Sequence, residues 1–519
     1  MVGSLNKLIV MNAFKASNTT TKLTATVNAT AAALSAALSA ELSVALSTAL
    51  RKTLTTTLAV ALAAVASPLV LAQASSSGST TASAHTASAA NNLRAGPMVG
   101  DVDMHNASIW VQLERPGPFE LEVWPLAAGT LAAAGPQGAV QRLRGQASAA
   151  LALGTATVRV TGLEAGQAYG YRLMIDGRAQ GTPLQFKTHA RWQFRQGIWA
   201  PNVRIALGSC SYTNEPPRDR DGAPYGGEHE IFSAMAQAQP DLTVWLGDAV
   251  YFRENETSSA EGMAYRWRHD RALPELQGLL RTGRHIATWD DHDFGPNDSN
   301  GSFVLKHHAL DLFKSYWANR SHGLPETPGV FGNVLESDVE LFMLDDRYHR
   351  DSDRAKDHPG KTMLGAEQLK WLKNALLAST ATFKVIVNGS QMLNDGNRFE
   401  GWNHFRTERD GFLQWLKDHQ VRGVLLISGD RHHTELMRLP REGTYPLHEL
   451  TCSPLTAGPT RIAQSESPAL HVPGTMVNQR NFCTLDVSGT RGQRVMTVRS
   501  RDVKGKELWV QTLREQDLK

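Results

Sequence analysis

Short apolar runs alternate with segments of helical periodicity from about residue 200 onward. The apolar runs predict strands at "VRIALGS", "DLTVWLG", "RHIATWD", "VELFMLD", "FKVIVNG" and "GVLLISG". Between them the pattern predicts helices at residues 228–239, 306–318, 365–379 and 409–419. Strands that alternate with helices indicate an α/β domain, which we place at residues 195–519. After residue 434 the helical pattern fades, and we expect strands at "LHELTCS", "NFCTLDVSG" and "RVMTVRS" that complete a second sheet.

Residues 96–190 show strand-like alternation without helical segments. Two such runs flank Pro116-Gly117-Pro118, and two more lie in "ATVRVTGLEAGQAYGYRLMIDG". Short strands and frequent turns predict a small all-β domain at residues 96–190, a sandwich of the immunoglobulin or fibronectin III type. It holds no cluster of acids or histidines of its own.

Residues 1–74 are rich in Ala, Ser, Thr and Leu, and we interpret them as a leader. Its segment 51–74 starts with two basic residues, continues with the apolar run 58–71 and ends with "AQA", which is typical of an export signal. The run is too short for a membrane anchor. Because this signal lies deep in the chain, we favour a start codon assigned too far upstream. The alternative is an Ala-rich arm, and residues 75–95 are predicted to form a flexible linker.

The bulk composition excludes some classes of function. Among 519 residues, 41% are hydrophobic and 20% charged, the net charge is +3, and no Lys/Arg-rich block occurs. This composition argues against a dedicated nucleic-acid binder, and we expect no nucleic-acid-binding surface. Three cysteines do not make a disulfide scaffold, although Cys452 and Cys483 are one possible pair.

Polar side chains of a particular kind follow each α/β strand. In open α/β sheets the ligand crevice lies at the carboxyl ends of the strands, so these groups are expected to converge there. They comprise Cys210; Asp248 and Tyr251; Asp290, Asp291, His292, Asp293 and Asn297; Asp345, Asp346 and Arg347; Asn388 and Gln391; and Asp430 and His432.

Carboxylate, imidazole, thiolate, phenolate and amide groups together form a set of hard to borderline metal ligands. Several carboxylates at one sheet edge would repel each other unless cations neutralised them, which favours two or more metal ions. Each residue also has a simpler explanation. Cys210 is compatible with a buried hydrophobe, Asp248 with a turn cap, and Arg347 with a partner of a carboxylate. The joint pattern at one strand end favours the metal site.

The ordered motifs "GSC … GDxxY … WDDHD … LDDR … GDRHH" resemble the alkaline phosphatase D family of the calcineurin-like metallophosphatase superfamily. The resemblance covers about residues 200–460, and the preceding β-region is also similar to that family's N-terminal domain. It implies a two-sheet α/β/β/α sandwich with metals at the sheet edges. It also implies phosphoester hydrolysis with Fe³⁺ and Ca²⁺.

By position, Asp248 matches the aspartate that bridges the two metals in that family. A thiolate and a phenolate favour a trivalent ion at Cys210, Tyr251 and His432, although the sulfur keeps Zn²⁺ possible. Asp291 and Asp430 are expected to hold the second, harder ion, which is Ca²⁺, Mn²⁺ or Mg²⁺.

Two positions bear on the second metal site. Asn297 is a further candidate calcium ligand. The superfamily's middle Gly-His motif corresponds to "NGSQ" here, so only Asn388 or Gln391 is available in its place.

The expected mechanism is attack of a metal-bound hydroxide on phosphorus. His292, oriented by Asp293, is expected to protonate the leaving oxygen, and Arg347 to clamp the phosphate or a ligand carboxylate. A Gly-x-Ser-x-Gly elbow is absent from the sequence, which weakens a serine hydrolase interpretation.

The resulting hypothesis is an exported, periplasmic or secreted metallophosphoesterase that acts on phosphomonoesters, phosphodiesters or both. Its substrate is a small-molecule or polymeric phosphoester, and its mature form has no transmembrane anchor. One alternative is a phospholipase D-like phosphodiesterase on lipid or cell-wall polymer. An alternative of another class is a non-catalytic exported protein that binds a surface polymer through residues 96–190.

Overall fold

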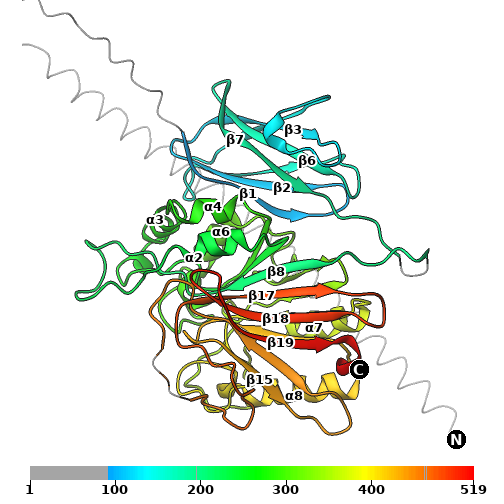
Figure 1. Ribbon diagram of the computed structural model, residues 1–519. Coiled ribbons are helices and arrows are strands. Elements are labelled where there is room, and N and C mark those ends of the chain that lie inside the picture. Colours follow the sequence, from blue (N-terminus) through cyan, green and yellow to red (C-terminus); the bar gives the residue numbers. More distant parts are fainter. Residues whose placement is uncertain (1–91, 194–195, 461, 463) are drawn as a thin grey trace, which may run out of the picture. The chain divides into compact units, whose positions relative to one another are not determined.

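The computed structural model describes residues 92–519 except 194, 195, 461 and 463 (Figure 1). The predicted leader 1–74, its export signal 51–74 and the linker up to residue 91 lie outside the described residues. The first strand, β1 (Leu93–Val102), begins inside the predicted linker 75–95, so the last residues of that segment are strand. No helix in the described part of the chain is long and apolar enough to span a membrane.

A nine-stranded sheet contains three parallel strands that are followed by predicted ligand residues: β8 (Val203–Gly208), β9 (Leu242–Leu246) and β10 (Arg284–Thr288). Antiparallel strands extend it beyond β8: β17 (Asn481–Ser488), β18 (Val495–Asp502) and β19 (Glu507–Arg514). The expectation that the strands after residue 434 complete a second sheet is therefore wrong for β17 and β18, because the free edge of β8 pairs with β17.

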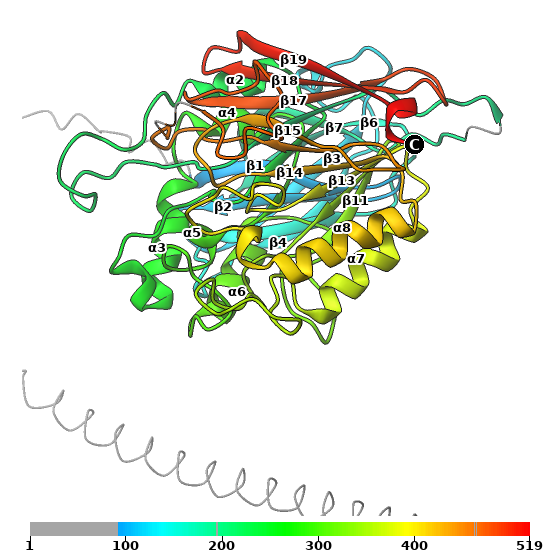
Figure 2. The ribbon, with the colours of Figure 1, turned by 90° about the horizontal axis from the view of Figure 1, so that it is seen from below.

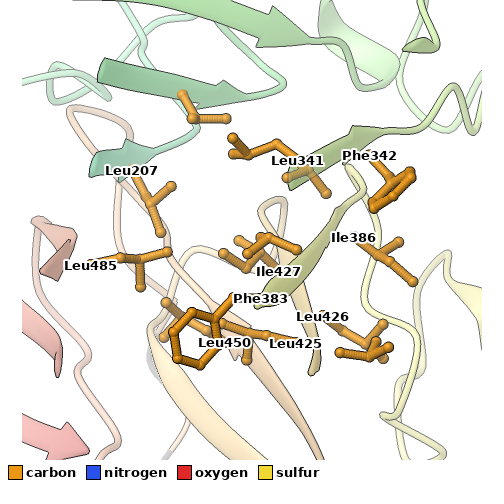
Figure 3. Close-up of a cluster of buried hydrophobic side chains, with 14 of the residues drawn as sticks. Leu207, Leu341, Phe342, Phe383, Ile386, Leu425, Leu426, Ile427, Leu450 and Leu485 are labelled. Carbon is orange, nitrogen blue, oxygen red and sulfur yellow. The ribbon is translucent and has the colours of Figure 1, made fainter. Parts of the chain in front are cut away.

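The other α/β strands form a six-stranded sheet. In spatial order it comprises β11 (Gly332–Glu336), β12 (Val339–Met343), β13 (Phe383–Val387), β14 (Val424–Ser428), β16 (Leu447–Thr451) and β15 (Glu435–Leu439). One hydrophobic core joins the two sheets. Leu207 and Leu485 from the larger sheet pack with Leu341 and Ile427 from the smaller one (Figure 3). The layers are held face to face by apolar burial.

Helices cover the outer faces of both sheets. α7 (Ala366–Ala378) and α8 (Arg406–Asp418) share the core of the six-stranded sheet (Figure 2). Shorter helices pack with the nine-stranded sheet: α2 (Ile231–Gln237), α3 (Ala260–Asp270), α4 (Leu276–Leu280), α5 (Asp291–Phe294) and α6 (Lys306–Tyr316). Single turns of 3₁₀-helix occur at Ala132–Ala134, Glu256–Ser258, Trp402–His404 and Glu515–Leu518. The mixed α/β fold agrees with the sequence pattern.

The strands of residues 96–190 divide between two sheets. β1 pairs in parallel with β10, so that β1, β2 (Ala107–Leu113) and β5 (Thr155–Val160) continue the nine-stranded sheet. A four-stranded sheet packs against them and comprises β4 (Gln141–Gln146), β3 (Pro118–Pro125), β6 (Ala168–Ile175) and β7 (Arg178–Lys187). The region is all-β, and its status as a separate domain stays a prediction.

A disulfide links the six-stranded sheet to the nine-stranded sheet. Cys452, which directly follows β16 of the smaller sheet, is bonded to Cys483 on β17 of the larger one. The pairing considered from sequence is therefore confirmed. Cys210 is free and buried, which leaves its thiol available as a ligand.

Candidate metal centre

The predicted ligand residues lie just beyond the ends of β8, β9, β10 and β14. Four of them have left-handed backbone: Cys210 (φ 60°), Asp248 (φ 52°), Asp430 (φ 62°) and His432 (φ 55°). This conformation is costly for residues other than glycine and persists where the surroundings impose it, often at functional sites. Here it turns four side chains out of strand direction toward one place.

Three side chains gather around the carboxylate of Asp248. The Cys210 thiol donates to Asp248 Oδ2 at 3.5 Å, and the Tyr251 hydroxyl donates to the same oxygen at 3.1 Å. The Tyr251 oxygen also lies 3.1 Å from His432 Nε2. A cation bound here would replace the thiol and phenol protons that now hold these groups together.

The ring of His432 is held through its Nδ1 atom. Its Nδ1 lies 2.7 Å from the carbonyl oxygen of Gly458 and 3.0 Å from the hydroxyl of Tyr225. Burial lowers the pKa of His432, which favours the neutral ring. A proton held on Nδ1 by the Gly458 carbonyl leaves the Nε2 lone pair directed at Tyr251, as in outer-sphere support of metal-ligating histidines.

A second ligand group shares Asp248 with the first. Ligand atoms of Cys210, Asp248 and His432 lie within 4.8 Å of one another, and so do those of Asp248, Asp291 and His292. Two overlapping groups with one common carboxylate form the pattern of two adjacent ions bridged by an aspartate. His292 therefore lies among possible ligands, and its ring packs on Tyr251 at a centroid distance of 4.2 Å.

The electrostatics of the site favour bound cations. Burial and the nearby Cys210 and Asp291 raise the pKa of Asp248 well above its usual range. Burial likewise raises the pKa of the Cys210 thiol to about 11. Asp430 Oδ2 is buried without a hydrogen bond among the described residues, and Arg431 Nη1 is 4.0 Å away. A cation would relieve all three, so the residues present fit a metal centre.

Comparisons with known proteins support this geometry. Residues 331–506 match the family model of a PhoD-like phosphatase, and residues 90–190 match a domain of unknown function, DUF7800. The chain is 24% identical to alkaline phosphatase D of Bacillus subtilis (strain 168), over 53% of this chain and 52% of that relative. The match thus spans about half the length of the curated relative.

Two solved structures share the fold. A structure of PhoD superposes with a TM-score of 0.64 at 18% identity, covering 80% of this chain and 88% of that one. The purple acid phosphatase PPD1 from yellow lupin (Lupinus luteus) seeds gives 0.54 at 10% identity, covering 80% and 74%. The chain carries a PhoD-like phosphatase domain. The family-model match includes Asp430 and His432, whereas Cys210, Asp248 and Asp291 precede it.

Arg347 of the PhoD-like domain is not placed as a phosphate clamp. It is fully buried, and its Nε donates to Asp290 Oδ1 at 2.7 Å. Its Nη1 and Nη2 donate to Glu400 at 2.5 and 2.7 Å. The simpler alternative, a partner of carboxylates, is therefore the one that the structure supports. Two buried acids occupy the guanidinium, which leaves it unavailable to a ligand.

Asp293 also has a different task from the predicted one. Its Oδ1 accepts from the backbone N–H groups of Ala249 and Val250 at 2.9 and 3.2 Å, and its Oδ2 accepts from that of Asp290 at 3.1 Å. These bonds tie the turn after β9 to the start of α5. Asp293 thus positions the Asp248 turn, and the expectation that it orients the His292 ring is wrong.

The amide candidates differ in their surroundings. Asn297 is exposed, and its Nδ2 donates to Asp298 at 2.8 Å. Gln391 is buried and donates to Thr451 at 2.7 Å, whereas Asn388 donates to the Ser390 carbonyl at 2.6 Å. Gln391 is committed to the interior, and a role for Asn297 at a metal stays a proposal.

Three functional neighbours escaped the sequence analysis: Tyr225, Glu400 and Ser453. The Ser453 hydroxyl donates to the Cys210 sulfur at 3.0 Å and accepts from the His432 backbone N–H at 3.0 Å. Tyr225 and Glu400 follow none of the predicted strands, and Ser453 ends the predicted strand "LHELTCS", whose end was not searched for ligands. In space, Ser453 connects Cys210 of the GSC motif with His432 of the GDRHH motif.

Proposed function

We propose that this protein is a metal-dependent phosphoester hydrolase of the alkaline phosphatase D type. The observation that carries the proposal is the pair of ligand groups that share Asp248 at one sheet edge. The family model and the curated relative, both of which are named as phosphatases, support the same reaction. The two ligand groups that share Asp248 argue against a non-catalytic surface-binding protein.

The residues define two sites of different character. Cys210, Tyr251 and His432 offer a thiolate, a phenolate and an imidazole, which suit Fe³⁺ or Zn²⁺. Asp291 and Asp430 offer hard oxygens to Ca²⁺, Mn²⁺ or Mg²⁺. Such ions, when bound, activate water and neutralise charge on the phosphoryl oxygens.

His292 is the chain's candidate for proton transfer. Its side chain is 22% exposed at the opening of the site, whereas Asp291 beside it is buried. Stacking on Tyr251 fixes its ring, so one nitrogen can face a leaving oxygen. Because the Arg347 guanidinium is paired with buried carboxylates, we expect His292 and the bound metals to bind the phosphoryl group.

We further propose that the protein is exported, either to the periplasm or out of the cell. The Cys452–Cys483 disulfide is typical of an oxidising compartment and agrees with the predicted signal 51–74. Substrates are expected to be phosphomonoesters or phosphodiesters, either small molecules or polymers. Lipid or cell-wall phosphodiesters are the alternative substrate class.

The test is hydrolysis of p-nitrophenyl phosphate and bis-p-nitrophenyl phosphate by the metal-loaded protein. Asp248→Asn removes the shared ligand and should lower kcat/KM at least about 100-fold, since metal stabilisation of transition-state charge amounts to several kcal/mol. Asp311→Asn, the same change on the exposed face of α6, is the matched control and should retain the wild-type rate. An equally active Asp248→Asn protein would remove this centre from the reaction.

A further inference from the structure

Two exposed aromatic side chains lie against the turn that carries Asp430 and His432. Tyr225 is 45% exposed and Phe399 is 63% exposed. The Tyr225 hydroxyl lies 3.0 Å from His432 Nδ1, and the Phe399 ring lies 5.1 Å below the guanidinium carbon of Arg431. Both rings therefore contact neighbouring residues of one metal-binding turn, although they come from loops far apart in the sequence.

The loop of Tyr225 is fixed rather than freely moving. Asn214 and Gly226 exchange two hydrogen bonds of 2.8 and 2.9 Å, and Arg480 donates to the Tyr225 carbonyl at 3.1 Å. The ring packs edge-on against Tyr212 at 5.0 Å. It also occupies the space over Gly458, where an added Cβ would come within 2.8 Å of the Tyr225 ring.

The loop of Phe399 is fixed by similar means. Asn397 Oδ1 accepts from the Phe399 backbone N–H at 2.9 Å, and His404 Nε2 lies 2.6 Å from the Phe399 carbonyl oxygen. Arg431, whose guanidinium lies over the Phe399 ring, pairs with Glu466 at 2.8 Å. The backbone is thus bonded on both sides of a side chain that remains exposed.

We propose that Tyr225 and Phe399 form an aromatic rim that binds the leaving group of the substrate and selects phosphoesters with a planar ring, such as nucleoside phosphates. The inference rests on the proposed function and names a substrate class for the same site. The proposal places the leaving group of a phosphoryl group held near Asp248 beside the turn of residues 430–432, which both rings contact. Rigid aromatic surfaces stack on a base with little loss of conformational entropy.

The test compares AMP with ribose 5-phosphate, which both carry the phosphate on the primary 5-hydroxyl of ribose and differ by the base. The ratio of their kcat/KM values should be about 5- to 100-fold in favour of AMP, the range expected from stacking of one base. Phe399→Leu and Tyr225→Leu should each move this ratio toward one. Tyr225→Phe keeps the ring and should keep the ratio, whatever its effect through His432.

The control is Leu377→Ala, which removes an exposed apolar side chain from α7 and should leave the ratio unchanged. The proposed rim is refuted if the ratio of kcat/KM for AMP to that for ribose 5-phosphate is near one in wild type. It is also refuted if neither leucine variant changes this ratio. Hydrolysis of p-nitrophenyl phosphate with such a ratio refutes only the rim. Failure of the metal-loaded protein to hydrolyse these three monoesters and bis-p-nitrophenyl phosphate refutes the proposed function, and the rim with it.

Discussion

Replacing Arg347 by methionine keeps an unbranched apolar stem and removes the charged guanidinium. In the native protein this guanidinium lies between Asp290 and Glu400, and the three side chains are 0%, 0% and 3% exposed. The variant leaves Asp290 buried without its cation, whereas Glu400 keeps Arg350 at 3.2 Å. Breaking a buried ion pair from one side costs about 3–5 kcal/mol, so we expect a loss of that size in the free energy of unfolding.

The assay is equilibrium unfolding in guanidinium chloride, followed by tryptophan fluorescence, for wild type and Arg347→Met. Arg354→Met, on an exposed residue, serves as the matched control and should change stability by less than about 0.5 kcal/mol. Adding Asp290→Asn to Arg347→Met should recover part of the loss, because the charge left without a cation disappears.

The opposite pattern would refute this reasoning. If Arg347→Met unfolded with the wild-type midpoint while KM for a phosphoester rose strongly, Arg347 would be a substrate clamp after all. The buried pairs with Asp290 and Glu400 would then not describe the working protein.

Three further predictions concern other parts of the molecule. The double variant Cys452→Ser/Cys483→Ser should lose about 4 kcal/mol of stability, because the bond closes a loop of 31 residues, and an unchanged denaturation midpoint would argue against the bond. Burial lowers the pKa of His285 to about 3, below its unfolded value of about 6.5. Above about pH 6.5 the ring is neutral in both states, and below it only the unfolded state takes up the proton. By pH 5 stability should therefore fall by about 2 kcal/mol from this residue; stability that is flat from pH 7 to 5 would contradict it. A ferric site predicts a visible charge-transfer band that disappears in Tyr251→Phe, and a colourless, iron-free wild type would exclude iron.

The core strands and the ligand positions were readable from the sequence for one physical reason. Buried parallel strands are short apolar runs, and the polar residue after each run lies at a common edge. This reasoning located β8, β9, β10, β13 and β14, and residues that follow β8, β9, β10 and β14 lie in the two ligand groups. β11 went unpredicted, because only two of its five residues are buried and its run is weak.

Sheet membership was not readable, because it depends on which edges remain free. β17 follows β16 in the chain but pairs with β8, and β1 pairs with β10 across a large separation. The task of Arg347 was hidden in the same way. Its partner Glu400 lies 53 residues further on, in a loop that no strand pattern marks.

The central claim is that Asp248 joins two metal ions, and elemental analysis of the purified protein tests it most directly. We expect about two ions per chain in wild type and in Asp311→Asn, and loss of both in Asp248→Asn because each site needs that carboxylate. A wild-type protein that hydrolyses phosphoesters at full rate with no bound metal after chelation would contradict the account.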